Sequence, residues 1–258
     1  MPKPPELIPG VHFDEPFFDA VVKRAGGHRL TDLHIPPPST KHVDYLIGGF
    51  ALELKILMSD PLDARERQKT IRDYLRSLLP RGPLWVTATK QAIAIAGEDS
   101  KAYWERIMGK PIQDRLDSAA DQIRGTRSFV PGSWKGGVLI VNSAGPSFDW
   151  LSFTHLAGTY RARFPEIDAV FALNAVPVVA EGKFELHFAT IAKEGSKPEA
   201  DSLWISLNGA IREEIAARTN RKIASIELDP HISPGKGAFL LTPSGVRVKR
   251  TLPPAQGQ

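Results

Sequence analysis

Short apolar or alternating segments, typical of β-strands, are interleaved along this chain with longer amphipathic segments, typical of α-helices. An interleaved order of this kind favours a β-sheet that is covered by helices. Strand pairs joined by short turns occur near both ends of the chain, which argues against a purely parallel sheet. The sequence therefore predicts an α/β fold with a mixed central β-sheet flanked by helices.

Hydrophobic periodicity, together with glycine and proline signals, sets the bounds of the predicted elements. Helices are predicted over 16–25, 60–79, 102–108, 112–123, 153–163 and 203–218. Strands are predicted over 43–47, 50–57, 84–89, 92–96, 137–141, 169–173, 176–180 and 184–191. The first two strands form a predicted hairpin that turns through Gly48 and Gly49.

The length of 258 residues favours one elaborated domain. We expect an extended arm over 1–12, a single domain with C-terminal elaborations over 13–250, and a flexible tail over 251–258. The chain has no cysteine, so any metal must be bound by oxygen or imidazole ligands. It shows no signal peptide and no apolar run long enough to cross a membrane, so a cytoplasmic protein is expected.

The predicted strand over 50–57 carries an acid and a base inside an apolar run. Because side chains alternate along a strand, Glu53 and Lys55 share one face, and the leucines around them share the other. Asp44 lies on the preceding strand of the hairpin, close enough for its carboxylate to converge with that of Glu53. Two carboxylates and one ammonium group are therefore predicted to meet.

Two simpler explanations of the charged pair stay open at this stage. The strand could lie at an edge of the sheet with one solvated face, or Glu53 and Lys55 could form a structural ion pair. The same spacing of an acid and a lysine recurs in the chain at two further pairs: Asp99 and Lys101, and Glu181 and Lys183. The second of these, with Asp168 before it, is a reserve candidate site.

A cluster of two carboxylates and a lysine suits Mg²⁺ or Mn²⁺, because hard cations take oxygen ligands and leave room for water and phosphate oxygens. Such a metal lowers the pKa of a bound water and stabilises charge on a phosphoryl group. A nearby lysine can orient that water or neutralise the phosphoryl oxygens. The cluster thus predicts phosphodiester hydrolysis.

The segment from Val43 to Lys55 resembles the active-site motif of the PD-(D/E)xK, or restriction-endonuclease-like, nucleases. The helix, hairpin, helix, strand order of 13–89 also fits the common core of that family. The resemblance implies a restriction-endonuclease-like core, with these roles: Asp44 and Glu53 as metal ligands, the Leu54 carbonyl as a further ligand, and Lys55 as a catalytic residue. The family's usual proline before the first acid is Val43 here.

The predicted helix over 60–79 carries a basic stripe, because Arg65, Lys69, Arg72 and Arg76 recur at helical spacing. A stripe of this kind can follow a phosphate backbone, or it can be a solvated helix face. The resemblance suggests that a polar residue of this helix reaches the active site, which makes Gln68 an accessory catalytic candidate. It also suggests an acid from the first helix, and Glu15 and Asp19 are the two choices.

The leading hypothesis is a Mg²⁺- or Mn²⁺-dependent nuclease that acts on nucleic acid, with DNA favoured, and that has no membrane partner. A homodimer would suit the cutting of both strands of a duplex. The alternative is a nuclease-like fold without catalysis, which serves as a binding module for nucleic acid or protein and binds in a salt-sensitive, metal-independent way.

Overall fold

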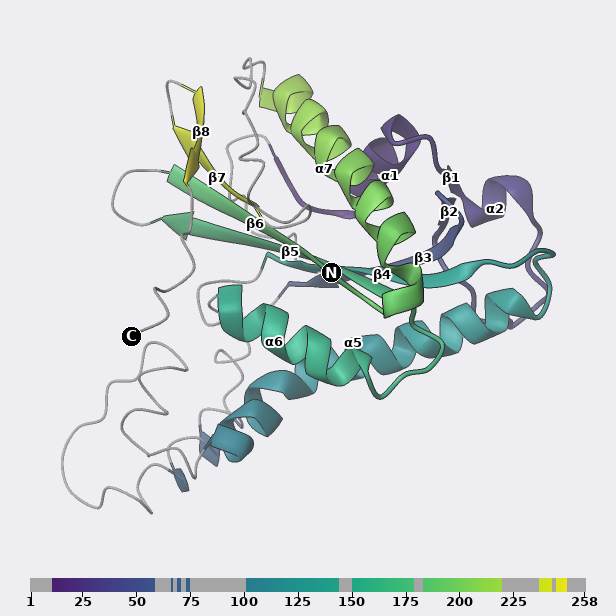
Figure 1. The fold of residues 1–258 in the computed structure, drawn as a ribbon, viewed down its shortest axis with the longest axis horizontal. Helices are drawn as coiled ribbons and strands as arrows, with labels where there is room; N and C mark the ends of the chain where they lie inside the picture. The colour runs from purple at the N-terminus through teal and green to yellow at the C-terminus, as the bar shows by residue number, and fades with distance from the viewer. Residues whose placement is uncertain are drawn as a thin grey trace.

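An eight-stranded β-sheet with helices on both of its faces organises the protein (Figure 1). The computed structural model describes residues 11–58, 66, 69–70, 73–74, 101–143, 150–178, 183–219, 237–242 and 245–249. The strands are β1 (His28–Arg29), β2 (Tyr45–Ile47), β3 (Phe50–Leu57), β4 (Lys135–Asn142), β5 (Ala169–Val178), β6 (Lys183–Ala192), β7 (Gly237–Thr242) and β8 (Gly245–Lys249). The helices are α1 (Glu15–Arg24), α2 (Leu30–Leu33), α5 (Lys101–Arg127), α6 (Trp150–Arg161) and α7 (Lys197–Thr219), with a 3₁₀ turn, η3 (Glu194–Ser196).

The strands lie in the sheet in the order in which they occur in the chain. β3, β4 and β5 are parallel, and all other neighbours are antiparallel. Parallel strands need crossover connections, and α5 and α6 supply them between β3 and β4 and between β4 and β5. The predicted mixed α/β sheet with flanking helices is therefore confirmed.

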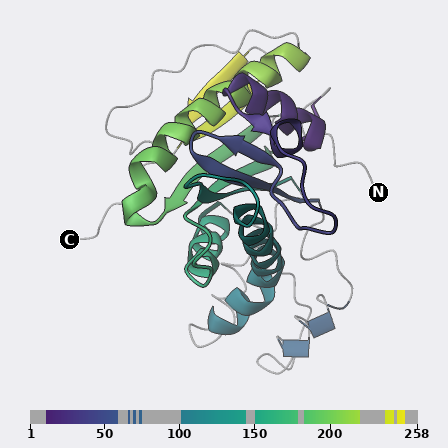
Figure 2. The same cartoon turned by 90° about the vertical axis from the view of Figure 1, so that its right-hand side faces the viewer.

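Two separate hydrophobic cores fill the spaces between the sheet and its helices. Figure 2 shows α1 and α7 on one face and α5 and α6 on the other. The core under α1 and α7 includes Phe17, Phe171 and Trp204, whereas the core under α5 and α6 includes Leu116 and Phe153. Strands β2 to β6 therefore each contribute side chains to both cores, which explains why β4 is apolar on both faces.

The hairpin between β2 and β3 turns through Gly48 and Gly49, as the sequence predicts. Both glycines have positive φ, at 56° and 80°, which other residues adopt at a cost. The register pairs Ile47 with Phe50 and Tyr45 with Leu52. By continuation, Asp44 comes opposite Glu53, so this turn sets the geometry of the two carboxylates.

Several predicted bounds are wrong, and proline or asparagine explains the main ones. The helices predicted over 102–108 and 112–123 are one helix, α5, with Pro111 inside it. The stripe of Ile112, Leu116 and Ile123 packs against the sheet, and this packing outweighs the hydrogen bond that Pro111 cannot make.

The strands predicted over 169–173 and 176–180 are the single strand β5. Asn174, which suggests a break in the sequence, stays in the strand because its Oδ1 accepts from Asn142 Nδ2 at 2.7 Å. Pro177 is tolerated because it lies beyond the last residue of β5 that pairs with β4. The short elements β1 and α2 were not predicted, since neither is long enough to show a period.

Other predictions fall on residues outside the described ranges. These include most of the helix over 60–79, of which residues 66, 69–70 and 73–74 are described and helical, and both strands over 84–96. The arm over 1–12 is described only at residues 11 and 12, and the tail over 251–258 not at all. Among the described helices, none combines the length and the apolar character that a membrane span requires.

Trp204 tests the core under α1 and α7. Its side chain is fully buried and packs against Phe171 and Phe188 at ring-centroid distances of 5.8 and 5.4 Å. We expect Trp204→Ala to lower the free energy of unfolding by about 3 to 5 kcal/mol, because it leaves a large cavity. Ile205→Ala, at the exposed neighbouring position of the same helix, should have little effect. Urea denaturation measures the free energy of unfolding of both variants, and an equal decrease in the two would contradict this placement of α7.

Candidate active site

The structure brings Asp44, Glu53 and Lys55 together on the face of the sheet that α5 covers. The solvated face that an edge strand would give the charged pair is not found, because the Lys55 and Glu53 side chains are only 12% and 3% exposed. Glu53 is only 2% exposed, although it carries a carboxylate. A carboxylate buried to this extent needs a partner, because removing it from water costs several kcal/mol.

Lys55 supplies one partner for the buried Glu53 carboxylate. Its Nζ donates to Glu53 Oε1 at 2.7 Å, and the Lys55 side chain is itself only 12% exposed. The other carboxylate oxygen, Glu53 Oε2, is buried and has no hydrogen-bond partner among the residues that the structure describes. Glu53 is therefore held by Lys55 through one oxygen, and it can form a hydrogen bond with the neighbouring Asp44 carboxyl group only when one of the two acids is protonated.

Asp44 completes the cluster from the adjacent strand. Its Oδ2 accepts a hydrogen bond from the backbone N–H of Leu54 at 2.9 Å, which fixes the carboxylate across the hairpin. The Leu54 side chain points to the opposite core, so only its backbone belongs to the site. The structure thus places both predicted ligand carboxylates and the Leu54 backbone side by side.

Burial and mutual repulsion raise the pKa of both carboxyl groups. Burial is the main cause for each of them. For Glu53 the negative charge of Asp44 adds to burial, while Lys55 opposes them, and the pKa rises to about 8. For Asp44 the Leu54 N–H, a hydrogen bond with Glu53 and the charge of Lys55 limit the rise. Two such groups favour a shared proton or a bound cation between them.

Gln122 of α5 joins the cluster, and the sequence analysis missed it. Its Oε1 accepts from Lys55 Nζ at 2.6 Å, and its Nε2 donates to the backbone carbonyl of His42 at 3.0 Å. Gln122 lies 67 residues after Lys55, and no spacing rule connects the two positions. The sequence offered one weak signal: Gln122 is next to Ile123, which belongs to the apolar stripe that packs α5 against the sheet.

The structure describes few of the predicted accessory residues. Gln68, Arg65, Arg72 and Arg76 lie outside the described residues. Lys69 lies in a described helical stretch and is exposed, as a basic stripe requires, but one residue does not establish a stripe. The role proposed for Gln68 therefore stays a prediction, and Gln122 is the helix residue seen at the site.

The two acids of α1 bind an arginine rather than the cluster. Arg29 donates to Glu15 Oε1 at 2.5 Å and to Asp19 Oδ2 at 2.6 Å, and the Tyr45 hydroxyl donates to Asp19 Oδ1 at 2.8 Å. Tyr45 belongs to the core under α1 and α7, on the other face of the sheet. Neither acid is therefore seen as a further ligand.

The reserve site is not assembled. The Asp168 carboxylate accepts from the Gly136 N–H and from Lys193 Nζ, both at 2.7 Å, so it ties β4 and β6 to the start of β5. Lys183 pairs with Val178 at the other end of the long β5–β6 hairpin, roughly 30 Å away at the rise of an extended strand. Glu181, Asp99 and the Lys101 side chain are not described.

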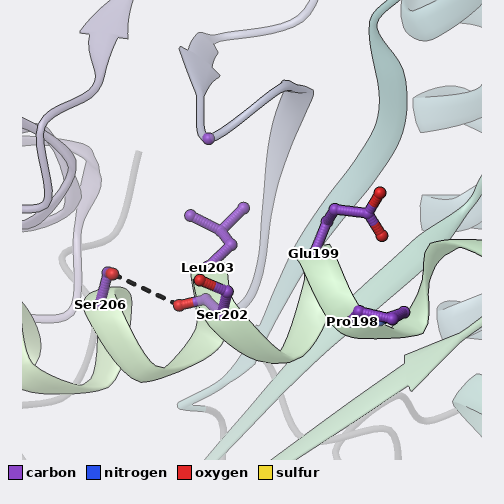
Figure 3. Close-up of a pocket in the computed structure, with 6 residues that line it drawn as sticks. Pro198, Glu199, Ser202, Leu203 and Ser206 are labelled. Atoms are coloured by element: carbon purple, nitrogen blue, oxygen red, sulfur yellow. Dashed lines mark hydrogen bonds between the residues drawn. The ribbon is translucent and has the colours of Figure 1, made fainter.

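A pocket of about 330 Å³ lies elsewhere, between α7 and the β2–β3 turn (Figure 3). Its lining residues are Gly48, Pro198, Glu199, Ser202, Leu203 and Ser206. Figure 3 shows that the labelled side chains come from the first turns of α7. This helix lies on the face of the sheet opposite to α5 (Figure 2). Asp44, Glu53 and Lys55 do not contribute to it.

The raised pKa of Glu53 predicts how stability depends on pH without metal. The folded chain holds this proton up to a pH of about 8, whereas a glutamate with the ordinary pKa of 4.5, as in the unfolded chain, loses it near pH 4.5. The stabilisation is therefore complete below pH 4.5 and is lost as pH rises through about 8. In EDTA, we expect the free energy of unfolding to fall over this window, by up to about 1.4 kcal/mol per pH unit. Glu53→Gln should flatten this slope in urea titrations, and an unchanged slope would contradict the assignment.

The chain was compared with known proteins by sequence and by structure. No protein-family model, curated protein or solved structure matches it. What the cluster of Asp44, Glu53, Lys55 and Gln122 does must therefore be inferred from its own geometry.

Proposed function

We propose that this protein is a divalent-metal-dependent nuclease that hydrolyses phosphodiester bonds, with DNA as the favoured substrate and Asp44, Glu53 and Lys55 at its active site. The observation that carries the proposal is the buried Glu53 carboxyl group, which binds Lys55 through one oxygen and lies beside a second carboxyl group, Asp44, whose charge adds to burial in raising the Glu53 pKa. A purely structural ion pair does not need a second carboxylate next to it.

The donor set fits Mg²⁺ or Mn²⁺. Two carboxylates offer hard oxygen ligands, and a cation between them would satisfy Glu53 Oε2 and remove the repulsion between the two groups. Within the described ranges no group of three or more acidic or histidine side chains is placed to hold a metal. Two protein carboxylates are sufficient for Mg²⁺, which keeps several waters and binds substrate phosphate oxygens. When bound, the metal supplies Lewis acidity and a more acidic water.

Lys55 is placed to act on the substrate. An ammonium group has three N–H donors, and Glu53 and Gln122 accept two of them. The third can donate to a phosphoryl oxygen, where it would stabilise the negative charge that builds up during hydrolysis. Because the side chain is mostly buried and held at two points, this donor is oriented before the substrate arrives.

The fold supports the same proposal. α1 precedes the β2–β3 hairpin, α5 covers the cluster, and β4 then pairs in parallel with β3. This order is compatible with the helix, hairpin, helix, strand order of a restriction-endonuclease-like core, but it uses α5 and β4 instead of the predicted elements over 60–79 and 84–89, and β1 and α2 come between α1 and the hairpin. The preference for DNA rests on the predicted basic stripe, of which Lys69 is described and exposed.

Cleavage assays test the proposal. Labelled single- and double-stranded DNA and RNA are incubated with Mg²⁺, Mn²⁺ or EDTA. We expect metal-dependent cutting by the wild type and a loss of at least about 100-fold in Glu53→Ala and Lys55→Ala, the usual cost of removing such groups. Asp44→Asn should also lose activity, because one of the two ligand charges is removed.

Matched controls guard against contamination and unfolding. Glu199→Gln and Lys110→Ala alter an acid and a lysine in exposed ion pairs away from the cluster, so both should cut like the wild type. Full cutting by Glu53→Ala would refute the proposal. No cutting by any form, together with salt-sensitive binding that ignores metal, would favour the binding module, which the closed Glu53 and Lys55 pair also permits.

A further inference from the structure

α5 binds the chain segment that leads into Asp44 through three adjacent contacts. Gln122 Nε2 donates to the His42 carbonyl at 3.0 Å, and Thr126 Oγ1 accepts from the Val43 N–H at 2.9 Å. Between them, Gly125 allows the Lys41 carbonyl to approach so closely that an added Cβ would lie 2.0 Å from it. Three consecutive residues of the segment are thus fixed by one turn of the helix.

Gln122 links this contact to the other half of the candidate site. The oxygen of the same side-chain amide accepts from Lys55 Nζ at 2.6 Å, while its nitrogen is anchored on His42. Thr126 is 1% exposed, and its hydroxyl donates to the Gln122 carbonyl at 2.9 Å while it accepts from Val43. One helical turn therefore contacts both Lys55 and the residue before Asp44.

We propose that Gln122 and Thr126 are positioning residues that hold the Lys55 ammonium group and the Asp44 carboxylate in register with each other. This inference rests on the proposed nuclease function and adds to it the residues that preorganise its site. Gln122 fixes the position of the Lys55 ammonium group, and Thr126 fixes the backbone N–H of Val43, the residue directly before Asp44. Neither side chain is assigned to the substrate or to the metal.

The chemistry of an amide suits this task. A carboxylate at position 122 would bind Lys55 as well, but it would add a third negative charge near Asp44 and Glu53 and could not donate to His42 when ionised. A glutamine accepts from the ammonium group and donates to the backbone at once. The amide therefore joins a charged group to the main chain without changing the net charge of the site.

The Lys55 ammonium signal gives a test that does not depend on activity. Nitrogen-15 NMR detects lysine ammonium groups whose protons exchange slowly, and Lys55→Arg identifies the Lys55 signal by its disappearance. We expect Gln122→Met, which keeps the side-chain size but removes both hydrogen bonds, to shift or broaden this signal. Asp121→Asn should leave it unchanged, because Asp121 meets Lys41 of the same segment through an exposed ion pair.

Metal affinity and kinetics test the second half of the proposal. Thr126→Val removes the hydroxyl at constant shape and should weaken Mn²⁺ binding, measured by EPR titration, by about 10- to 100-fold, as the loss of a supporting contact does. Thr126→Ser keeps the hydroxyl and should retain wild-type affinity. In cleavage, Gln122→Met should lower kcat by about 10- to 100-fold with little change in KM, because misplacement acts on the reacting groups.

The outcomes separate this inference from the proposed function. A wild type that neither binds Mn²⁺ nor cleaves would end the nuclease proposal, whereas the Lys55 signal would still decide the role of Gln122. An unchanged Lys55 signal in folded Gln122→Met would overturn that role. Equal Mn²⁺ affinities in Thr126→Val and Thr126→Ser would overturn the role of Thr126, and circular dichroism confirms that each variant is folded.

Discussion

The burial of the Glu53 carboxylate in the middle of the sheet is the constraint on which the rest of the site depends. Glu53 pairs with Val138 of β4, α5 covers its face of the sheet, and its side chain is almost completely removed from water. A charge in such a place needs compensation from nearby groups. Lys55 gives part of it, but burial, and then the negative charge of Asp44, still raise the pKa of Glu53. On the proposed function, a cation between the two carboxylates would supply the rest.

The hairpin and α5 place the charged groups of the cluster by different means. The β2–β3 turn, with its two positive-φ glycines, fixes which residues face each other, and so places Asp44 opposite Glu53. α5 closes the face of the sheet above them and presents Gln122 to Lys55. The apolar stripe of the same helix packs in the core next to the cluster, so the site and the core share one packing surface. Strain or loosening in α5 would consequently affect both stability and the geometry of the charged groups.

Local sequence patterns predicted the part of the site that depends on local geometry. The alternation of Glu53, Leu54 and Lys55 predicted a shared face, and the two glycines predicted the hairpin that adds Asp44. Gln122 could not be predicted, because its place depends on which helix packs over β3, and the connection between them is long. The helix nearest in sequence offered Gln68 instead. The same limit explains why α5 and β5 were each predicted as two elements. In both, contacts with the rest of the sheet outweigh the local break signals of Pro111 and Asn174.

The choice between a structural ion pair and a catalytic cluster depends on Asp44. If Glu53 and Lys55 served stability alone, a neutral residue at position 44 would remove the repulsion that raises the Glu53 pKa, and the fold would gain free energy. The chain instead holds the Asp44 carboxylate in place with the Leu54 N–H. An arrangement that costs stability and is fixed by specific hydrogen bonds is typical of a site that acts on a ligand. On the proposed function, a hard divalent cation would relieve this cost, because it would bind both carboxylates and leave Lys55 to face a phosphate.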